Sequence, residues 1–168
     1  MLIIKALQFA AEKHRGQTRK VSGLPYITHP IIVSELLRKY KTSKVLAQLI
    51  VAALLHDVLE DTDTTLNEIS NEFGSMVAGL VLELTSDKEE IKKLGKNKYL
   101  KKKMISMTSY ALVIKLVDRL SNILDNPTEK YCKDTLELIA FIERKRKILS
   151  KTHKKIIKDI RKECLKNI

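Results

Sequence analysis

The chain has 168 residues and a formal net charge of +12, from 32 Lys and Arg against 20 Asp and Glu, and 44% of its residues are hydrophobic. This length suffices for one domain with a real core, and the composition excludes a low-complexity chain. No apolar run is long enough to cross a bilayer, and the amphipathic first dozen residues do not read as a signal peptide. Cys132 and Cys164 lack CxxC spacing and are expected to be reduced thiols, so we expect a cytoplasmic protein without a membrane partner.

Hydrophobic periodicity predicts a first helix over about residues 2–15, in which His14 is expected to be a cap or a packed residue. A loop follows over residues 17–28, because QTRKVSGLPYIT contains Ser-Gly and a proline. Thr28 is expected to cap a second helix that runs to about Tyr40. The residues of this helix predicted to face inward are Ile32, Val33, Leu36 and Leu37.

The central stretch is LIVAALLHDVLED, residues 49–61. Its seven successive apolar residues predict a helix that is buried on all sides and starts near Thr42 or Ser43. On one continuous helix, His56 lies four residues from Glu60, and Asp57 lies four residues from Asp61, so an imidazole and three carboxylates share a face. Three acids this close repel one another, which favours a cation between them.

The rest of the chain also reads as helical. Thr65 and Glu68 fit a capping box, and Gly74 is expected to end the helix that follows it. Further helices are predicted over residues 76–84, 110–125, 135–149 and about 153–165, with a break at 150–152. Short helices are predicted around Gly95 within residues 86–103. No strand pattern, repeat or linker stands out, so the sequence predicts one all-α domain over residues 1–168.

Two lysine-rich tracts, residues 88–103 and 144–166, carry much of the positive charge. Apart from Tyr99 they lack interleaved aromatic residues, so solvated helix surfaces are favoured over a nucleic-acid interface. General attraction of a small anionic ligand is compatible with this charge.

Four ionisable residues stand out on otherwise apolar segments: His29, His56, Asp57 and Asp118. Two imidazoles and two carboxylates form a mixed set of ligands that suits Mn²⁺, Fe²⁺ or Zn²⁺ and leaves coordination positions open for water and substrate. Taken alone, His29 reads as a packed or capping residue and Asp118 as a partner of Arg119. The adjacent pair at the end of a buried helix is harder to explain structurally.

These residues match the His…His-Asp…Asp pattern of the HD-domain metal-dependent phosphohydrolases. The sequence around them resembles the hydrolase domain of RelA/SpoT-type proteins and the stand-alone small alarmone hydrolases. The segments that carry this resemblance are HRGQTRKVSGLPYITHP, ALLHDVLEDT, FGSMVAGLVLELT and IKLVDRLSNI. The resemblance covers roughly residues 2–123, with the segments in the family's order. It implies an all-α HD-domain bundle with a central buried helix.

The resemblance also implies roles for individual residues. One Mn²⁺ is expected on His29, His56, Asp57 and Asp118, with Fe²⁺ or Zn²⁺ as alternatives. Glu60 and Asp61 match the acidic pair assigned to the attacking water. Residues expected to bind the substrate are Arg19, Lys20 and Asn122.

The family removes the 3′-pyrophosphate of (p)ppGpp, the alarmone of the stringent response, to give GDP or GTP. A hydrolase without a synthetase domain is therefore the leading hypothesis, with a small anionic nucleotide as its partner. One alternative keeps the metal but changes the nucleotide, for example to NADPH. Another is a nucleotide- or nucleic-acid-binding module with a vestigial site, which the complete set of acidic and metal-binding residues disfavours. The sequence does not fix the oligomeric state.

Overall fold

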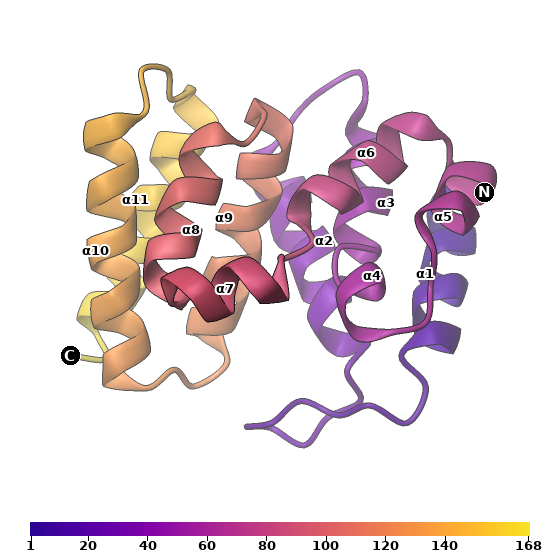
Figure 1. Ribbon diagram of the computed structural model, residues 1–168, viewed down its shortest axis with the longest axis horizontal. Helices are drawn as coiled ribbons and strands as arrows, with labels where there is room; N and C mark the ends of the chain where they lie inside the picture. The colour runs from indigo at the N-terminus through magenta and orange to yellow at the C-terminus, as the bar shows by residue number, and fades with distance from the viewer. The chain divides into compact units, whose positions relative to one another are not determined.

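Eleven helices and no strands form the structure, a computed structural model that describes residues 1–168 (Figure 1). The prediction of an all-α fold is confirmed. The helices divide between two compact units, Met1–Thr85 and Ser86–Ile168. One domain over residues 1–168 stays a prediction.

The first unit is built around α3. Its helices are α1 (Leu2–Lys13), α2 (Thr28–Tyr40), α3 (Leu46–Leu54), α4 (Val58–Asp61), α5 (Leu66–Phe73) and α6 (Ser75–Leu84). Helix α3 packs against α1, α2 and α6, and every residue from Leu49 to Leu55 is buried. A helix that is apolar on all sides is stable in water only when other helices cover it, and here three do so. The predicted central buried helix is confirmed.

Helix α2 has the predicted bounds, but two details of the prediction are wrong. Thr28 does not cap the helix: Ile27 is the N-cap, and the Thr28 hydroxyl donates to the main-chain oxygen of Pro25 at 2.8 Å. Ile32 is 45% exposed, whereas Val33 and Leu37 are fully buried. The buried stripe follows the four-residue spacing of Val33 and Leu37, and Ile32, one position before Val33, is turned about 100° away from it.

The predicted capping box at the start of α5 is confirmed. The hydroxyl of Thr65 accepts from the main-chain N–H of Glu68 at 3.2 Å, and the Glu68 carboxylate accepts from the main-chain N–H of Thr65 at 2.7 Å. This second bond is the main cause of the lowered pKa of Glu68. Gly74 ends the helix with a φ of +88°, a conformation that glycine adopts at little cost.

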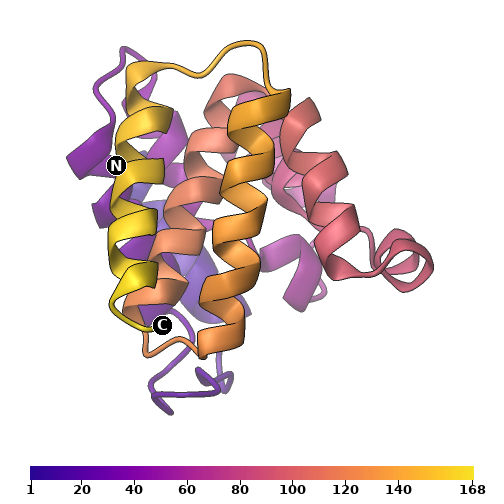
Figure 2. The same ribbon diagram turned by 90° about the vertical axis from the view of Figure 1, so that its left-hand side faces the viewer.

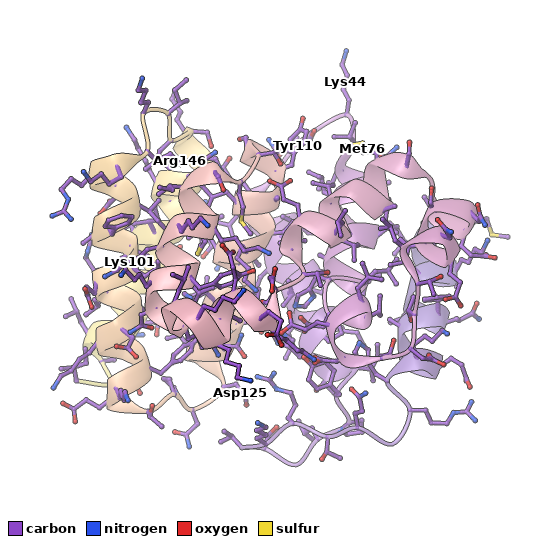
Figure 3. The ribbon with its side chains drawn as sticks, in the orientation of Figure 1. Lys44, Met76, Lys101, Tyr110, Asp125 and Arg146 are labelled. Carbon is purple, nitrogen blue, oxygen red and sulfur yellow. The ribbon has the colours of Figure 1, made fainter.

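The second unit contains α7 (Lys88–Leu94), α8 (Lys96–Ser106), α9 (Ser109–Leu124), α10 (Glu129–Lys145) and α11 (Lys151–Leu165). Helix α11 packs against α9 and α10, and α10 also packs against α8 (Figure 2). Figure 3 shows Lys101 on α8, and its ammonium group pairs with Glu137 of α10. The predicted break at Gly95 is confirmed by its φ of +79° between α7 and α8.

Helix α10 begins six residues before the predicted start at residue 135. The Thr128 hydroxyl accepts from the main-chain N–H of Tyr131 at 3.1 Å, so residues 129–134, four of which are charged, form the first turns of the helix. The helix ends at Lys145, before the predicted 149, and Ser150 caps α11. Hydrophobic periodicity places the start of α10 too late because the first turns of this helix are largely polar.

Both cysteines are free and buried, and they lie on the packed helices α10 and α11. Burial, together with the neighbouring Cys132 thiol, raises the pKa of Cys164 to about 12. A thiol with so high a pKa holds its proton at neutral pH and is a poor nucleophile. No helix in the structure combines the length and apolar character that a membrane span requires.

Candidate metal centre and active site

The site begins where the central helix breaks. The prediction of one continuous helix through residue 61 is wrong, because α3 ends at Leu54 and α4 starts at Val58. His56 takes part in this break: its Nδ1 lies 2.8 Å from the main-chain oxygen of Ala53 in the last turn of α3. The imidazole thus satisfies a carbonyl group at a helix end, where several carbonyls lack an intrahelical partner.

This hydrogen bond decides the chemistry of His56. A carbonyl oxygen can only accept, so Nδ1 carries the hydrogen and leaves the lone pair of the neutral imidazole on Nε2. His56 Nε2 lies 2.9 Å from Oδ2 of Asp57. A lone pair and an ionised carboxylate repel each other at this distance unless a proton or a cation lies between them. The pair is therefore suited to holding a divalent cation.

His29 joins the same cluster from the first turn of α2. Its Nε2 lies 3.8 Å from Oδ2 of Asp57, and its ring centroid is 5.2 Å from that of His56. The side chains of His29 and His56 are only 2% and 1% exposed, and that of Asp57 is 16% exposed. The first unit thus brings together three of the four predicted ligands, two imidazole nitrogens and one carboxylate, in largely buried surroundings.

Asp118, the fourth predicted ligand, lies on α9 in the second unit and is buried. Its Oδ2 pairs with Lys115 Nζ at 2.9 Å, and its Oδ1 accepts from the Asn122 side-chain amide at 2.8 Å. The alternative that Asp118 pairs with Arg119 is wrong. Arg119 instead donates to Thr135 at 2.7 Å, because successive residues on a helix do not face each other.

The predicted acidic pair lies on α4. Glu60 is half-buried and Asp61 is exposed. The Tyr26 hydroxyl lies 3.5 Å from Oδ2 of Asp61, and the main-chain oxygen of Asp61 accepts from the Gln17 side chain at 2.9 Å. Because α4 is only one turn long, it keeps both acids within a turn of Asp57, its N-cap residue.

The predicted basic pair lies on a tight loop between α1 and α2. An isolated antiparallel bridge joins Thr18 to Pro25, and the main-chain N–H of Arg19 donates to the Leu24 oxygen at 2.8 Å. The loop projects beyond the helices of its unit (Figure 1). The Arg19 guanidinium lies 6.0 Å from the centroid of the Tyr26 ring, while Lys20 is exposed. This loop presents two cations next to a residue that contacts the acidic cluster.

A sequence model of the HD domain matches residues 6–148, which is most of the chain. The chain belongs to the HD domain family. The match spans parts of both units and includes all the predicted site residues.

The relatives of the chain within this family carry consistent names. It is 43% identical over 126 residues to the human guanosine-3′,5′-bis(diphosphate) 3′-pyrophosphohydrolase MESH1, covering 73% of this chain and 68% of that protein. It is 39% identical over 153 residues to the protein of the same enzymatic name from Aquifex aeolicus, covering 82% of this chain but 20% of the relative.

A solved structure is also similar. It belongs to a metazoan ortholog of SpoT that is described as hydrolysing ppGpp and playing a role in starvation responses. The TM-score is 0.74 at 30% sequence identity, over 94% of each chain. The similarity in sequence therefore extends to the fold.

Three residues around the site were not predicted as part of it: His14, Gln17 and Tyr26. His14 had been expected to be a cap or a packed residue, and it is both, because it is the C-cap of α1 and is 3% exposed. Gln17 and Tyr26 lie in a segment that reads as a loop. All three residues lie in the segment HRGQTRKVSGLPYITHP, which resembles the family, but the segment alone does not show which of its residues contact the site.

Proposed function

We propose that this chain hydrolyses the 3′-pyrophosphate of (p)ppGpp, giving GDP or GTP and pyrophosphate. The observation that carries the proposal is the buried cluster of His29, His56 and Asp57, in a chain that is 43% identical to a 3′-pyrophosphohydrolase of guanosine bis(diphosphate). The partner is thus a small, strongly anionic nucleotide, in keeping with the net charge of +12.

We assign one divalent cation, Mn²⁺, to His29, His56, Asp57 and Asp118, with Fe²⁺ or Zn²⁺ as alternatives. The nitrogen and oxygen donors suit these metals, and the hydrogen on His56 Nδ1 leaves Nε2 ready to bind one. When bound, such a cation polarises a phosphoryl oxygen and makes a neighbouring water more acidic. The pattern His…His-Asp…Asp supports the inclusion of Asp118.

The roles of the chain's own residues follow from their chemistry. Glu60, half-buried on α4, accepts the proton of the attacking water, and Asp61 orients that water. Arg19 and Lys20 bind the anionic nucleotide, since a guanidinium suits both a phosphate and the face of a purine. Asn122 binds the substrate near its sugar, and its side-chain amide also donates to the Asp118 carboxylate at 2.8 Å.

We place this activity in the cytoplasm, where it lowers the level of the alarmone in the stringent response. The two free thiols support this placement, because reduced cysteines are typical of that compartment.

The proposal is tested with a panel of phosphorylated nucleotides. The protein is stripped of metal, reloaded with Mn²⁺ and incubated with ppGpp, pppGpp, GTP or NADPH, and the products are separated by ion-exchange chromatography. We expect one pyrophosphate for each GDP formed from ppGpp and each GTP formed from pppGpp, and no turnover before reloading. Release of orthophosphate from NADPH at a higher kcat/KM than pyrophosphate from ppGpp would overturn the substrate assignment.

A further inference from the structure

Tyr26 is held in place from several sides. Its main-chain N–H donates to the Gln17 oxygen at 2.9 Å, and its own main-chain oxygen accepts from the N–H of His29 at 2.9 Å. Its ring packs against the His14 ring at 4.7 Å between centroids and meets the His29 ring at 5.9 Å. The direction of its hydroxyl is therefore fixed by both backbone and ring contacts.

That hydroxyl donates to Oδ2 of Asp57 at 2.6 Å. This distance is typical of a hydrogen bond from a neutral O–H group to an ionised carboxylate, which is among the stronger hydrogen bonds in proteins. The same Oδ2 atom lies near the imidazoles of His29 and His56. Packing alone would be served equally well by phenylalanine, so the hydroxyl calls for a role of its own.

His14 and Gln17 brace this arrangement. His14 is buried, and its Nδ1 donates to the side-chain oxygen of Gln17 at 2.8 Å, because an amide oxygen can only accept. The amide nitrogen of Gln17 donates to the main-chain oxygen of Asp61 at 2.9 Å. The end of α1, the loop and the end of α4 are thereby joined around Tyr26.

We propose that Tyr26, braced by His14 and Gln17, is a positioning residue that fixes the carboxylate of Asp57 for cation binding. The inference rests on the proposed metal site and adds a residue to it. A carboxylate that binds a metal must keep one orientation, and a hydrogen bond to one of its oxygens restricts its rotation. Loss of such a supporting bond typically lowers metal affinity about 10–100-fold.

The test compares Tyr26→Phe with wild type and with Tyr99→Phe. Tyr99 of α8 is a suitable control because it is buried and its hydroxyl accepts from the main-chain N–H of Asp87, the N-cap residue of α7, at 2.7 Å. Free Mn²⁺ is followed by its electron paramagnetic resonance signal during titration of each protein. We expect the Kd for Mn²⁺ to rise about 10–100-fold in Tyr26→Phe and to stay unchanged in Tyr99→Phe.

The outcomes separate the two proposals. If wild type and both variants bind Mn²⁺ equally well, the positioning role of Tyr26 is wrong and the metal site stands. If wild type itself binds none of Mn²⁺, Fe²⁺ and Zn²⁺, both proposals are wrong. Gln17→Ala provides a second test in case Tyr26→Phe does not fold. A Gln17→Ala protein with native circular dichroism, unchanged Mn²⁺ affinity and unchanged kcat would contradict the bracing.

Discussion

Glu60 and Asp57 carry the same functional group in different surroundings. The carboxylate of Asp57 lies among Tyr26 and two imidazoles, whereas Glu60 is half-buried on the single turn of α4. Both side chains are partly buried, so their neighbours rather than their burial distinguish them. A carboxylate among imidazoles is suited to binding a cation, and a second carboxylate one turn away is suited to accepting a proton from water. We therefore propose metal binding for Asp57 and proton transfer for Glu60.

Glu60→Gln keeps the shape of the side chain and removes its basicity. We expect this variant to retain bound Mn²⁺ while kcat for ppGpp falls about 10²–10⁴-fold, the usual contribution of a general base. Metal content by mass spectrometry and pyrophosphate release check the two halves of this prediction. The matched control is Glu72→Gln, an exposed residue that pairs with Lys5 and should leave both quantities unchanged. A Glu60→Gln enzyme with near-normal kcat would remove this residue from the mechanism.

The kinds of residue at the site could be predicted from sequence, but their partners could not. His56 and Asp57 stand out because ionisable groups are costly within an apolar segment, and that cost is visible in the sequence. Tyr26 does not stand out, since its role depends on a contact across 31 residues of chain with Asp57. Helix geometry selects the partner of Asp118, because Lys115 lies three residues away on the same face and the adjacent Arg119 faces elsewhere.

At the scale of secondary-structure elements, α3 and α4 show that hydrophobic periodicity predicts burial better than it predicts helix ends. The apolar run predicts burial correctly, because every residue from Leu49 to Leu55 is buried. It does not predict the end of α3 at Leu54, because no glycine or proline marks the break. At the break, His56 Nδ1 donates to the Ala53 oxygen, a side-chain contact that hydrophobic periodicity does not report.

Like His56 at the end of α3, His153 hydrogen-bonds to the main chain at a helix end, here the start of α11. Its Nδ1 accepts from the main-chain N–H of Ser150 at 3.0 Å, and its Nε2 donates to the main-chain oxygen of Ser109 at 2.9 Å. One buried imidazole therefore completes a capping box and ties α11 to the start of α9. The sequence marks this histidine only as the approximate start of a helix.

We expect His153→Ala to lower the free energy of unfolding by about 1–3 kcal/mol, because it leaves a carbonyl and an N–H group without their partner. Urea denaturation followed by circular dichroism measures the change. Lys151→Ala, an exposed substitution in the first turn of the same helix, is the control and should leave the midpoint unchanged. Equal midpoints for the two variants would show that the imidazole contributes no stability.

For the whole molecule, the net charge of +12 raises the question of which cations bind the substrate. Arg19 lies over the ring of Tyr26, which itself contacts Asp57. Lys98 and Lys154 are exposed residues of the two lysine-rich tracts. Charges in direct contact with a substrate act at any moderate salt concentration, whereas charges that act only through their field are screened over about 10 Å at 0.1 M salt.

We therefore expect Arg19→Ala to lower kcat/KM for ppGpp even at 0.15 M salt. The double variant Lys98→Ala/Lys154→Ala should lower kcat/KM only at low salt. Steady-state kinetics at two salt concentrations distinguish the two effects. Loss of activity at moderate salt in the lysine variant, with full activity in Arg19→Ala, would place the nucleotide on the lysine-rich helices instead.

We propose that one divalent cation, held by His29, His56, Asp57 and Asp118, enables this chain to hydrolyse (p)ppGpp. The most direct measurement is the Mn²⁺ content of purified Asp57→Ala and Asp118→Ala, compared with wild type and with Asp63→Ala, an exposed control. We expect about one Mn²⁺ per chain in wild type and the control, and loss of both metal and pyrophosphate release in each of the other two variants. Wild-type metal content in both Asp57→Ala and Asp118→Ala would contradict the assignment.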